Sequence, residues 1–558
     1  MPRPYPHPLA VFSLKPLNER AYDVVNHPAN DRLVSTLVDG TLALDIGHAV
    51  SESGEATTLA TLGRNADIII PGASISKIQC SFEINPDTNV IMFYDRSYNL
   101  STQVFGENKT PFEYGRPRKV VVRNDCNTKI GMGGEQRKLV RFELMWHSGP
   151  MHAMEKVKDR QRGALEVNPR LARTIDEADT DTALTRMATR PHTSGPGQPT
   201  IRYLTLGENL GSGAFGNVEK VLDTDTGRLM ALKLVKRPSR EAEEMALSNM
   251  LKREVENLSR LSHPHIVDYI AFQGGDEVDF KIFMGLKEGT LQSLIENNSS
   301  SLADHDVGYI VFHQMLQAID FLATEDIIHR DVKPANILYV VQSSQYCFQL
   351  GDFGLSNRPS IARTVAGSPL YMAPEISQGG RQTHKVDVWS LCATILWTLD
   401  MDEFRQRSNE YRTFEDCRRA VQSRASKLCL IEEMARVNPE ERASAAQMLI
   451  KCFDGEGLST PRNQVPALDD NTAQTGAELR TAQTGADPRT PTVVPTRKPK
   501  KFIRKRKLAK RTPQVRFRIG KVRHVAKQPN SFDHPAAKKW AELESLGIEN
   551  LPVVSRDY

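Results

Sequence analysis

Two short motifs in the second half of the chain carry side chains suited to moving a proton and binding a metal. In the segment 329–336 (His-Arg-Asp-Val-Lys-Pro-Ala-Asn), Asp331 can accept or orient the proton of a hydroxyl group. Lys333 can steady a transferring phosphate, and Asn336 offers a carbonyl oxygen to a metal. Asp352, followed by Phe and Gly, adds a carboxylate, a ligand that Mg²⁺ prefers. This set of residue types predicts phosphoryl transfer to a hydroxyl.

A glycine-rich segment precedes these motifs. Residues without Cβ let the backbone approach a phosphate closely, although glycine-rich loops often do no more than turn a hairpin. The motifs that follow it in the chain favour the phosphate-binding interpretation. The residues of this segment expected to contact a nucleotide are Gly211, Ser212, Gly213, Ala214, Phe215, Gly216 and Val218.

A lysine and a glutamate follow at the spacing that this chemistry requires. Lys233 lies in a strand-like run after the loop, where it can pair with nucleotide phosphates, and Glu254 lies on a predicted helix, where it can hold Lys233. A lone Lys and a lone Glu would usually be surface charges. Their order and distance in this chain predict an ion pair instead.

Residues 201–453 resemble a eukaryotic protein kinase domain, on the motifs above together with Ala373-Pro-Glu375. The resemblance implies a bilobal α+β fold, ATP and Mg²⁺ as cofactors, and protein substrates. It places Met284 against the nucleotide, makes Asp387 the support of the catalytic loop, and pairs Arg442 with Glu375. Lys333 and the Gly-Ser-Pro run before Ala373 are similar to the serine/threonine branch of the family.

The resemblance also predicts how the kinase is activated. Members with an arginine before the catalytic aspartate, here Arg330, are typically controlled by a phosphate on the activation loop. Thr364 lies in that loop, where a phosphate would add about −1.5 to −2 charge and pair with Arg330. An ordinary solvated threonine is the alternative, and other candidate phosphosites are Ser356, Ser360 and Ser368.

Residues 10–147 hold short β-rich runs separated by Gly, Pro, Asn and Asp, which predict a β-sandwich. Within them, Leu62-Gly-Arg-Asn65, Ser74-Ile-Ser-Lys-Ile-Gln79 and Asp95-Arg-Ser-Tyr-Asn99 together resemble a forkhead-associated (FHA) domain, which binds phosphothreonine peptides. On this resemblance Arg64, Ser76 and Lys77 bind the phosphate and Asn99 fixes the peptide backbone. The family often has histidine at Gln79 and glycine at Leu100, so a sandwich that has lost phosphopeptide binding is the alternative.

The remaining segments are polar. Residues 148–200 are predicted to be a linker, and residues 454–558 a low-complexity, disordered basic tail with 21 Lys+Arg and 11 Asp+Glu, a net charge of +10. Because the whole chain carries +5, the rest carries −5. The basic run 497–511 is consistent with importin binding and nuclear import, with a nucleic-acid or acidic-partner contact, or with a merely solvated segment.

The chain shows no apolar run long enough to span a membrane, its proline-rich start does not resemble a signal peptide, and its seven cysteines are scattered. We therefore expect a nuclear protein, also found in the cytoplasm, without membrane contact. An FHA-like domain, a linker and a kinase domain resemble the checkpoint effector kinases, which implies DNA-damage or cell-cycle signalling. The alternative is a phosphopeptide-binding scaffold whose kinase fold is catalytically silent.

Overall fold

The computed structural model describes residues 2–133, 139–147, 200–213, 216–235, 255, 261–275, 278–297, 303–356 and 368–468. Several predictions lie outside these residues. They concern the side chains of Ala214, Phe215, Glu254, Ser360 and Thr364, most of the linker, and the basic run 497–511. Among the described helices, none is both long and apolar enough to cross a membrane.

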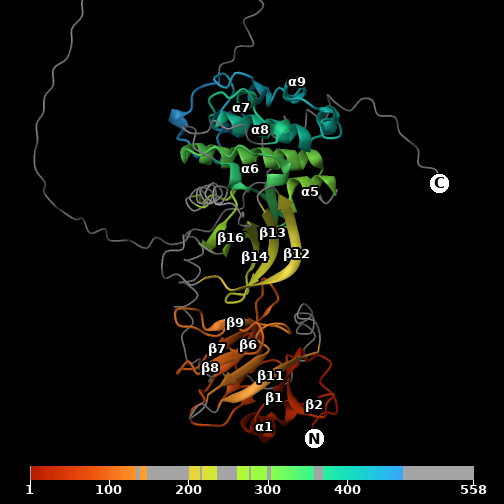
Figure 1. Cartoon of the computed structure of the whole chain (residues 1–558), viewed down its shortest axis with the longest axis vertical. Coiled ribbons are helices and arrows are strands. Elements are labelled where there is room, and N and C mark those ends of the chain that lie inside the picture. The colour runs from red at the N-terminus through yellow and green to blue at the C-terminus, as the bar shows by residue number, and fades with distance from the viewer. Residues whose placement is uncertain are drawn as a thin grey trace, which may run out of the picture. The chain divides into compact units, whose positions relative to one another are not determined.

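The N-terminal region forms two sheets whose strands are mostly antiparallel, in agreement with the β-sandwich that the short β-rich runs predicted (Figure 1). In one, β2 (Val34–Thr36), β3 (Leu42–Ile46), β1 (Phe12–Pro16), β11 (Val140–Trp146), β10 (Lys129–Met132) and β8 (Thr102–Phe105) are neighbours in that order. In the other, the order is β5 (Ile68–Ile69), β4 (Thr58–Gly63), β6 (Cys80–Ile84), β7 (Ile91–Asp95) and β9 (Lys119–Val122).

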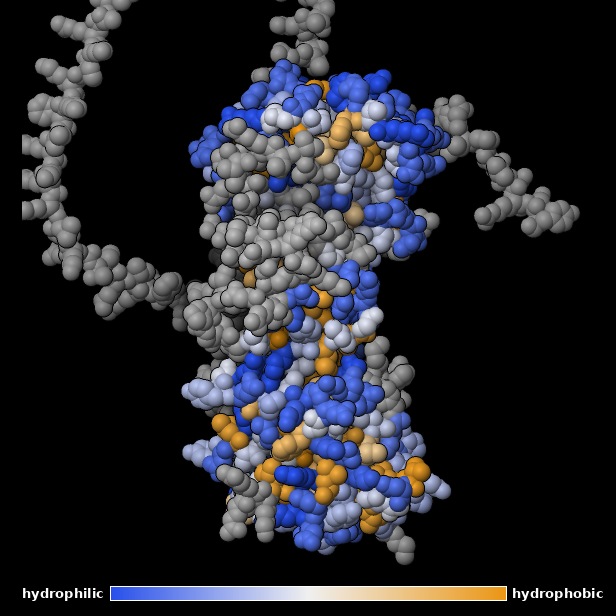
Figure 2. Space-filling model, in the orientation of Figure 1, coloured by the Kyte–Doolittle hydropathy of each residue, from blue (hydrophilic) through white to orange (hydrophobic). Residues whose placement is uncertain are grey.

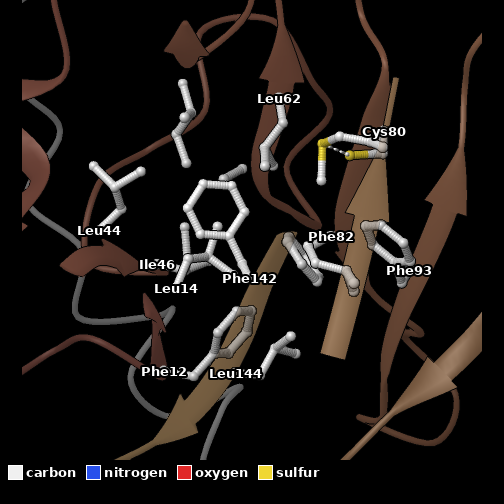
Figure 3. Packing of buried hydrophobic residues seen from close by; sticks show 14 of the residues in the cluster. Phe12, Leu14, Leu44, Ile46, Leu62, Cys80, Phe82, Phe93, Phe142 and Leu144 are labelled. Atoms are coloured by element: carbon white, nitrogen blue, oxygen red, sulfur yellow. Dashed lines mark hydrogen bonds between the residues drawn. The ribbon is translucent and has the colours of Figure 1, made fainter. Parts of the chain in front are cut away.

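The two sheets share one apolar core, to which β4 and most other strands contribute largely buried runs. In β11, Val140, Phe142 and Leu144 are buried while the residues between them reach solvent. Figure 3 shows aromatic rings from both sheets in this core; the ring centroids of Phe12 and Phe82 are 5.0 Å apart. One helix, α1 (Glu19–Val25), begins at Asn18, whose side chain accepts the Ala21 N–H.

The predicted kinase region begins with a five-stranded antiparallel sheet. Its strands, in spatial order, are β12 (Tyr203–Gly213), β13 (Gly216–Asp223), β14 (Leu229–Val235), β16 (Val278–Gly285) and β15 (Tyr269–Gly275). A small sheet of β17 (Gly289–Thr290), β18 (Ile337–Gln342) and β19 (Gln345–Leu350) follows.

The rest of this region is mainly helical. Its described α-helices are α5 (Leu291–Glu296), α6 (Asp304–Thr324), α7 (Pro374–Ser377), α8 (Lys385–Thr398), α9 (Phe414–Ala425) and α10 (Ala445–Phe453). The apolar spacing over 312–322 correctly predicted the middle of α6. Helix α8 is buried around its whole circumference and packs beside α6 (Figure 1), which explains why its sequence is almost continuously apolar.

The compact part of the chain ends at Pro461, beyond residue 453, where the kinase domain was predicted to end. Asp320 on α6 is buried and accepts hydrogen bonds from the backbone N–H of Ser459 (2.7 Å), the N–H of Thr460 (2.9 Å) and the Thr460 hydroxyl (2.6 Å). These bonds hold the first residues of the predicted tail against α6.

Figure 2 shows mainly hydrophilic residues on the described surface of this view, with small apolar patches among them.

Candidate functional site: catalytic loop, glycine-rich hairpin and sandwich loops

The glycine-rich segment is the tip of the β12–β13 hairpin, where Gly213 lies opposite Gly216. Gly216 has φ +133°, and a Cβ there would lie 2.3 Å from the carbonyl oxygen of Leu234 on β14. Glycine is therefore required for the hairpin to approach β14. A Cβ at Gly211 would meet nothing within 4 Å, so open space borders the hairpin backbone, as a phosphate cradle needs.

Lys233 lies on β14, between Val218 of β13 and Ile282 of β16. Its ammonium group is nearly buried and lies 2.9 Å from Oδ1 of Asp352. Burial by itself would raise the pKa of Asp352, but the charge and hydrogen bond of Lys233 outweigh burial and lower that pKa. Asp352 is therefore held as a carboxylate, with a side chain that remains 38% exposed.

Asp331 is the centre of a hydrogen-bond network. Its Oδ2 accepts bonds from Lys333 Nζ and from Asn336 Nδ2, both at 2.8 Å. Its Oδ1 faces the N–H and hydroxyl of Ser368, both at 3.3 Å, and Lys333 Nζ also donates to the Ser368 hydroxyl at 2.9 Å. The carboxylate is thus fixed in orientation and surrounded by donors, as a group that receives a substrate hydroxyl requires.

The catalytic loop rests on Asp387 of α8, as the family resemblance implied. The Asp387 carboxylate is fully buried and accepts the N–H groups of His329 and Arg330, each at 2.8 Å. Burial raises the pKa of Asp387, and His329 and the two N–H donors oppose that rise. His329 also binds the Gly351 carbonyl at 2.9 Å and packs edge-on against Phe353, which links this loop to Asp352.

Arg442 and Glu375 form the predicted ion pair. Two nitrogens of the guanidinium reach two oxygens of the carboxylate, at 2.7 and 2.9 Å, and both side chains are buried. The Arg442 guanidinium also lies over the Trp389 ring, 5.2 Å from its centroid. This bidentate pair ties α7 to the segment before α10.

The residues predicted to hold Mg²⁺ fit a hard cation. The side-chain nitrogen of Asn336 donates two hydrogen bonds to Asp331, one to its backbone carbonyl and one to its carboxylate. The amide oxygen of Asn336 is therefore the atom available to a metal. Asp352, a partly exposed carboxylate, is the second oxygen donor. Asn336 and Asp352 come from segments joined by the hydrogen bond from the Gly351 N–H to the Asn336 carbonyl, at 2.8 Å.

The four residues predicted to bind phosphothreonine lie on three loops that hydrogen bonds join. Arg64 follows β4, and its N–H donates to the Ser76 carbonyl at 3.0 Å. The Ser76 hydroxyl accepts the Tyr98 N–H at 3.3 Å, next to Asn99. The side chains of Arg64, Lys77 and Asn99 are exposed, and Ser76 is half-buried. The structure thus brings these predicted residues to one set of loops.

Gln79, at the position where the FHA family often has histidine, connects two of these loops through hydrogen bonds. Its Oε1 accepts the Ser76 N–H at 2.9 Å, and its Nε2 donates to the hydroxyls of Ser101 (3.0 Å) and Thr102 (2.9 Å). The side chain is fully buried. Gln79 therefore holds two of the three loops together, which agrees with an architectural role at this position.

The third loop contains a left-handed turn. Leu100 has φ +49°, a conformation that favours glycine, the residue that the FHA family often has at this position. The turn is fixed by the Ser97 hydroxyl, which accepts the Ser101 N–H at 2.9 Å, and by Arg118, which donates to the Leu100 carbonyl at 3.0 Å.

Ser368 is the site residue that sequence reasoning did not identify in this role. It was considered only as a phosphosite, whereas its hydroxyl and N–H both face Asp331. The signal available in the sequence was the Gly-Ser-Pro run ahead of Ala-Pro-Glu. Ser356, another candidate phosphosite, is buried, and its hydroxyl donates to the Phe353 carbonyl at 2.7 Å, so a kinase could not reach it in this conformation.

Comparisons with known proteins agree with this site. Residues 204–453 match the protein kinase domain family. The ovarian-specific serine/threonine-protein kinase Lok of Drosophila melanogaster is 31% identical over 265 residues, 44% of this chain and 55% of Lok. The SNF1-related protein kinase catalytic subunit alpha KIN12 of Arabidopsis thaliana is 30% identical over 257 residues, 44% of this chain and 49% of that protein. The cytokinesis protein sepH of Aspergillus terreus is 34% identical over 202 residues, 36% of this chain and 14% of sepH.

Residues 204–453 are therefore a protein kinase domain of the serine/threonine type. The chain spans about half the length of Lok and KIN12, and a smaller share of sepH.

Proposed function

We propose that this protein is an ATP-dependent serine/threonine kinase whose N-terminal sandwich binds phosphothreonine peptides. The observation that carries the catalytic part is the set of bonds at Asp331, where Lys333, Asn336 and Ser368 fix one carboxylate. A silent kinase fold has no need of such a network. The intact Lys233–Asp352 contact supports the same conclusion.

Each residue has a defined task in this proposal. ATP would supply the γ-phosphoryl group, and a bound Mg²⁺ would neutralise charge on the phosphate oxygens. Asp331 orients the serine or threonine hydroxyl and takes its proton as the hydroxyl oxygen bonds to the γ-phosphorus, while the bond from that phosphorus to the β–γ bridging oxygen breaks and ADP leaves. Lys333 stabilises the charge that develops on the transferring group. Lys233 binds the α- and β-phosphates, with Glu254 as its partner, and Asn336 and Asp352 hold the metal.

The proposed regulation uses the remaining predicted groups. Phosphothreonine binding through Arg64, Ser76, Lys77 and Asn99 would recruit the kinase to phosphorylated proteins and raise its local concentration. A phosphate on Thr364 would then pair with Arg330. We further propose nuclear import by importin through the basic run 497–511. A role in checkpoint signalling is proposed from the order of an FHA-like domain, a linker and a kinase domain along the chain.

A kinase assay tests the catalytic proposal. Purified full-length protein would be incubated with Mg²⁺ and labelled ATP on serine, threonine and tyrosine peptides. We expect transfer to serine and threonine only, and a loss of turnover of about 10²- to 10⁴-fold in Asp331→Asn. The matched control is Asp326→Asn, an exposed residue with φ +57° that asparagine tolerates. Equal activity in wild type and Asp331→Asn, or none in either, would favour the scaffold alternative.

A further inference from the structure

A short segment after α10, the strap, lies along α6. It comprises residues 455–461, which belong to no helix or strand. The carbonyl oxygen of Glu456 lies 3.3 Å from Nε2 of His313 on α6. One residue later, a Cβ on Gly457 would lie 2.2 Å from the side chain of Gln317, one helical turn further along α6. The strap and α6 therefore run side by side in close contact.

Three short hydrogen bonds fasten the end of the strap to the Asp320 carboxylate. Its Oδ2 accepts the N–H groups of Ser459 (2.7 Å) and Thr460 (2.9 Å), and its Oδ1 accepts the Thr460 hydroxyl (2.6 Å). Asp320 is 1% exposed, and within the described part of the chain it accepts no other hydrogen bond and forms no ion pair. The buried negative charge is thus satisfied by the donors of two consecutive strap residues.

The surroundings of Asp320 offer no positive charge to balance a second anion. His263 stacks on Phe321, the next residue of α6, with ring centroids 4.9 Å apart. Burial lowers the pKa of His263 to about 4, although the charge of Asp320 acts in the opposite direction. Near pH 7 this imidazole is neutral, so a negative charge added at the anchor would meet the Asp320 carboxylate uncompensated.

Thr460 combines this contact with a local sequence that a class of enzymes recognises. It is followed by Pro461, which is exposed, and the Thr460 side chain is half-buried. Proline lacks a backbone N–H and fixes its own backbone angle, and proline-directed serine/threonine kinases are the class that accepts it directly after the target residue. Segments outside helices and strands open locally far more often than the core unfolds, which gives such an enzyme access to the hydroxyl.

We propose that Thr460 is a phosphorylation site for a proline-directed kinase, and that its phosphate detaches the strap from α6. In the transfer, the Thr460 hydroxyl oxygen bonds to the γ-phosphorus of ATP, the bond from that phosphorus to the β–γ bridging oxygen breaks, and ADP leaves. The hydroxyl proton passes to the base of the modifying enzyme. This site lies outside the proposed catalytic and phosphothreonine-binding functions and does not depend on either.

The phosphate acts on the anchor in two ways. The Thr460 oxygen loses the hydrogen that it donates to Oδ1, and the phosphate brings about −1.5 to −2 charge against a buried carboxylate. Like charges at hydrogen-bond distance in a buried site cannot both remain there, so the strap leaves α6. Its release uncovers the side of α6 that carries His313 and Gln317.

Hydrogen exchange of the full-length protein tests the proposal, because the N–H groups of Ser459 and Thr460 are themselves donors to Asp320. The protein is incubated with ATP and a purified proline-directed kinase, and mass spectrometry maps the phosphate. We expect phosphate on Thr460. Exchange in peptides covering 455–461, corrected for intrinsic rates, should become about 10- to 100-fold faster, the factor expected for losing one hydrogen bond to a charged group.

Two variants separate this site from other modifications. Thr460→Val cannot be phosphorylated at that position, so the added kinase should leave its strap exchange unchanged. Ser459→Ala keeps the backbone bond to Asp320 and the Thr-Pro pair, and should respond as wild type does. Both variants retain the remaining Ser-Pro and Thr-Pro pairs of the chain, which begin at Thr110, Ser368, Thr490 and Thr512.

A third variant tests whether the anchor controls access to Thr460. Asp320→Asn has one acceptor oxygen where the carboxylate has two, so the strap opens more often and the initial rate of Thr460 phosphorylation should rise about 5-fold or more. Asp326→Asn, which changes an exposed aspartate just after α6, should keep the wild-type rate. Equal rates in Asp320→Asn and wild type would contradict control by the anchor.

The remaining outcomes each overturn a defined part of the proposal. Absence of phosphate on Thr460 after incubation overturns the modification site. Phosphorylated Thr460 with unchanged strap exchange, or equal acceleration in Thr460→Val, overturns the release. Phosphate that appears on Thr460 without the added enzyme assigns the transfer to this chain and overturns the assignment to a proline-directed kinase.

Discussion

The catalytic loop and the sandwich loops use charge in opposite ways. At Asp331 the carboxylate is already paired with the ammonium group of Lys333, and it also accepts a hydrogen bond from the neutral amide of Asn336. At the sandwich loops, Arg64 and Lys77 face solvent, and the buried hydrogen bonds belong to a frame of Gln79, Asp95 and Arg118 behind them. A catalytic group needs a fixed orientation before the substrate arrives, whereas an anion-binding site needs cations whose charge is still available.

The largest effect should come from removing the support of the catalytic loop. Asp387→Asn retains one acceptor oxygen for two N–H donors, so His329 or Arg330 loses its partner and the loop shifts. We expect turnover to fall about 100-fold or more, because small displacements of catalytic groups are costly. The assay is steady-state phosphorylation of a peptide, with exposed Asp402→Asn as the control. Unchanged turnover would show that the loop keeps its geometry without Asp387.

A second prediction concerns the buried ion pair between Arg442 and Glu375, which ties α7 to the segment before α10. Arg442→Ala leaves the Glu375 carboxylate buried without its partner, which should lower the free energy of unfolding of the kinase domain by about 3–5 kcal/mol. Urea unfolding followed by tryptophan fluorescence measures the change. Arg407→Ala, which breaks the exposed pair with Glu410, should leave the midpoint unresolved from wild type. Comparable losses in both variants would contradict the prediction.

The sandwich frame provides a third test of the comparison. Gln79→Ala removes the side chain that bridges Ser76 to Ser101 and Thr102, and should weaken phosphopeptide binding about 5- to 10-fold without altering any exposed cation. Gln79→His, which can donate and accept hydrogen bonds, should lose about 3-fold or less. Isothermal titration calorimetry distinguishes the two. An alanine variant that binds like wild type would mean that the loops hold their positions without the bridge.

The smallest effect should be a shared sensitivity to acid. Burial lowers the pKa of His48 in the sandwich and of His263 in the kinase domain, each to about 4. The unfolded chain binds protons at these groups near pH 6.5 and the folded chain does not, so stability is present above pH 6.5 and is lost as the pH falls toward 4. We expect each region to lose about 1 kcal/mol between pH 6.5 and 5, after allowance for partial exposure to solvent.

Amide hydrogen exchange, with rates corrected for the pH dependence of exchange itself, measures the stability of the sandwich and of the kinase domain separately. His48→Phe should remove the acid sensitivity of the sandwich peptides and leave that of the kinase peptides unchanged. An acid response that persists in the sandwich of His48→Phe would assign it to another group.

The sequence was sufficient for the kinase domain because phosphoryl transfer constrains residue types at fixed spacing. Lys233, Asp331, Asn336 and Asp352 each carry a functional group with few substitutes, so their order identifies the fold and the site together. The sandwich strands were also predictable, because short β-rich runs are separated by Gly, Pro, Asn and Asp, which favour turns. Loop positions such as Arg64 followed from the resemblance to the FHA domain.

Tertiary structure alone decided several contacts between distant residues that no motif of the chain indicates. No local pattern indicates that Ser368 faces Asp331, that Gln79 bridges two loops, or that Asp320 holds residues 459–460 against α6. These bonds depend on how whole elements pack, and polar side chains such as serine and glutamine occur with the same local sequence on open surfaces. The sequence thus determined which chemical groups are present, and the fold decided which of them meet.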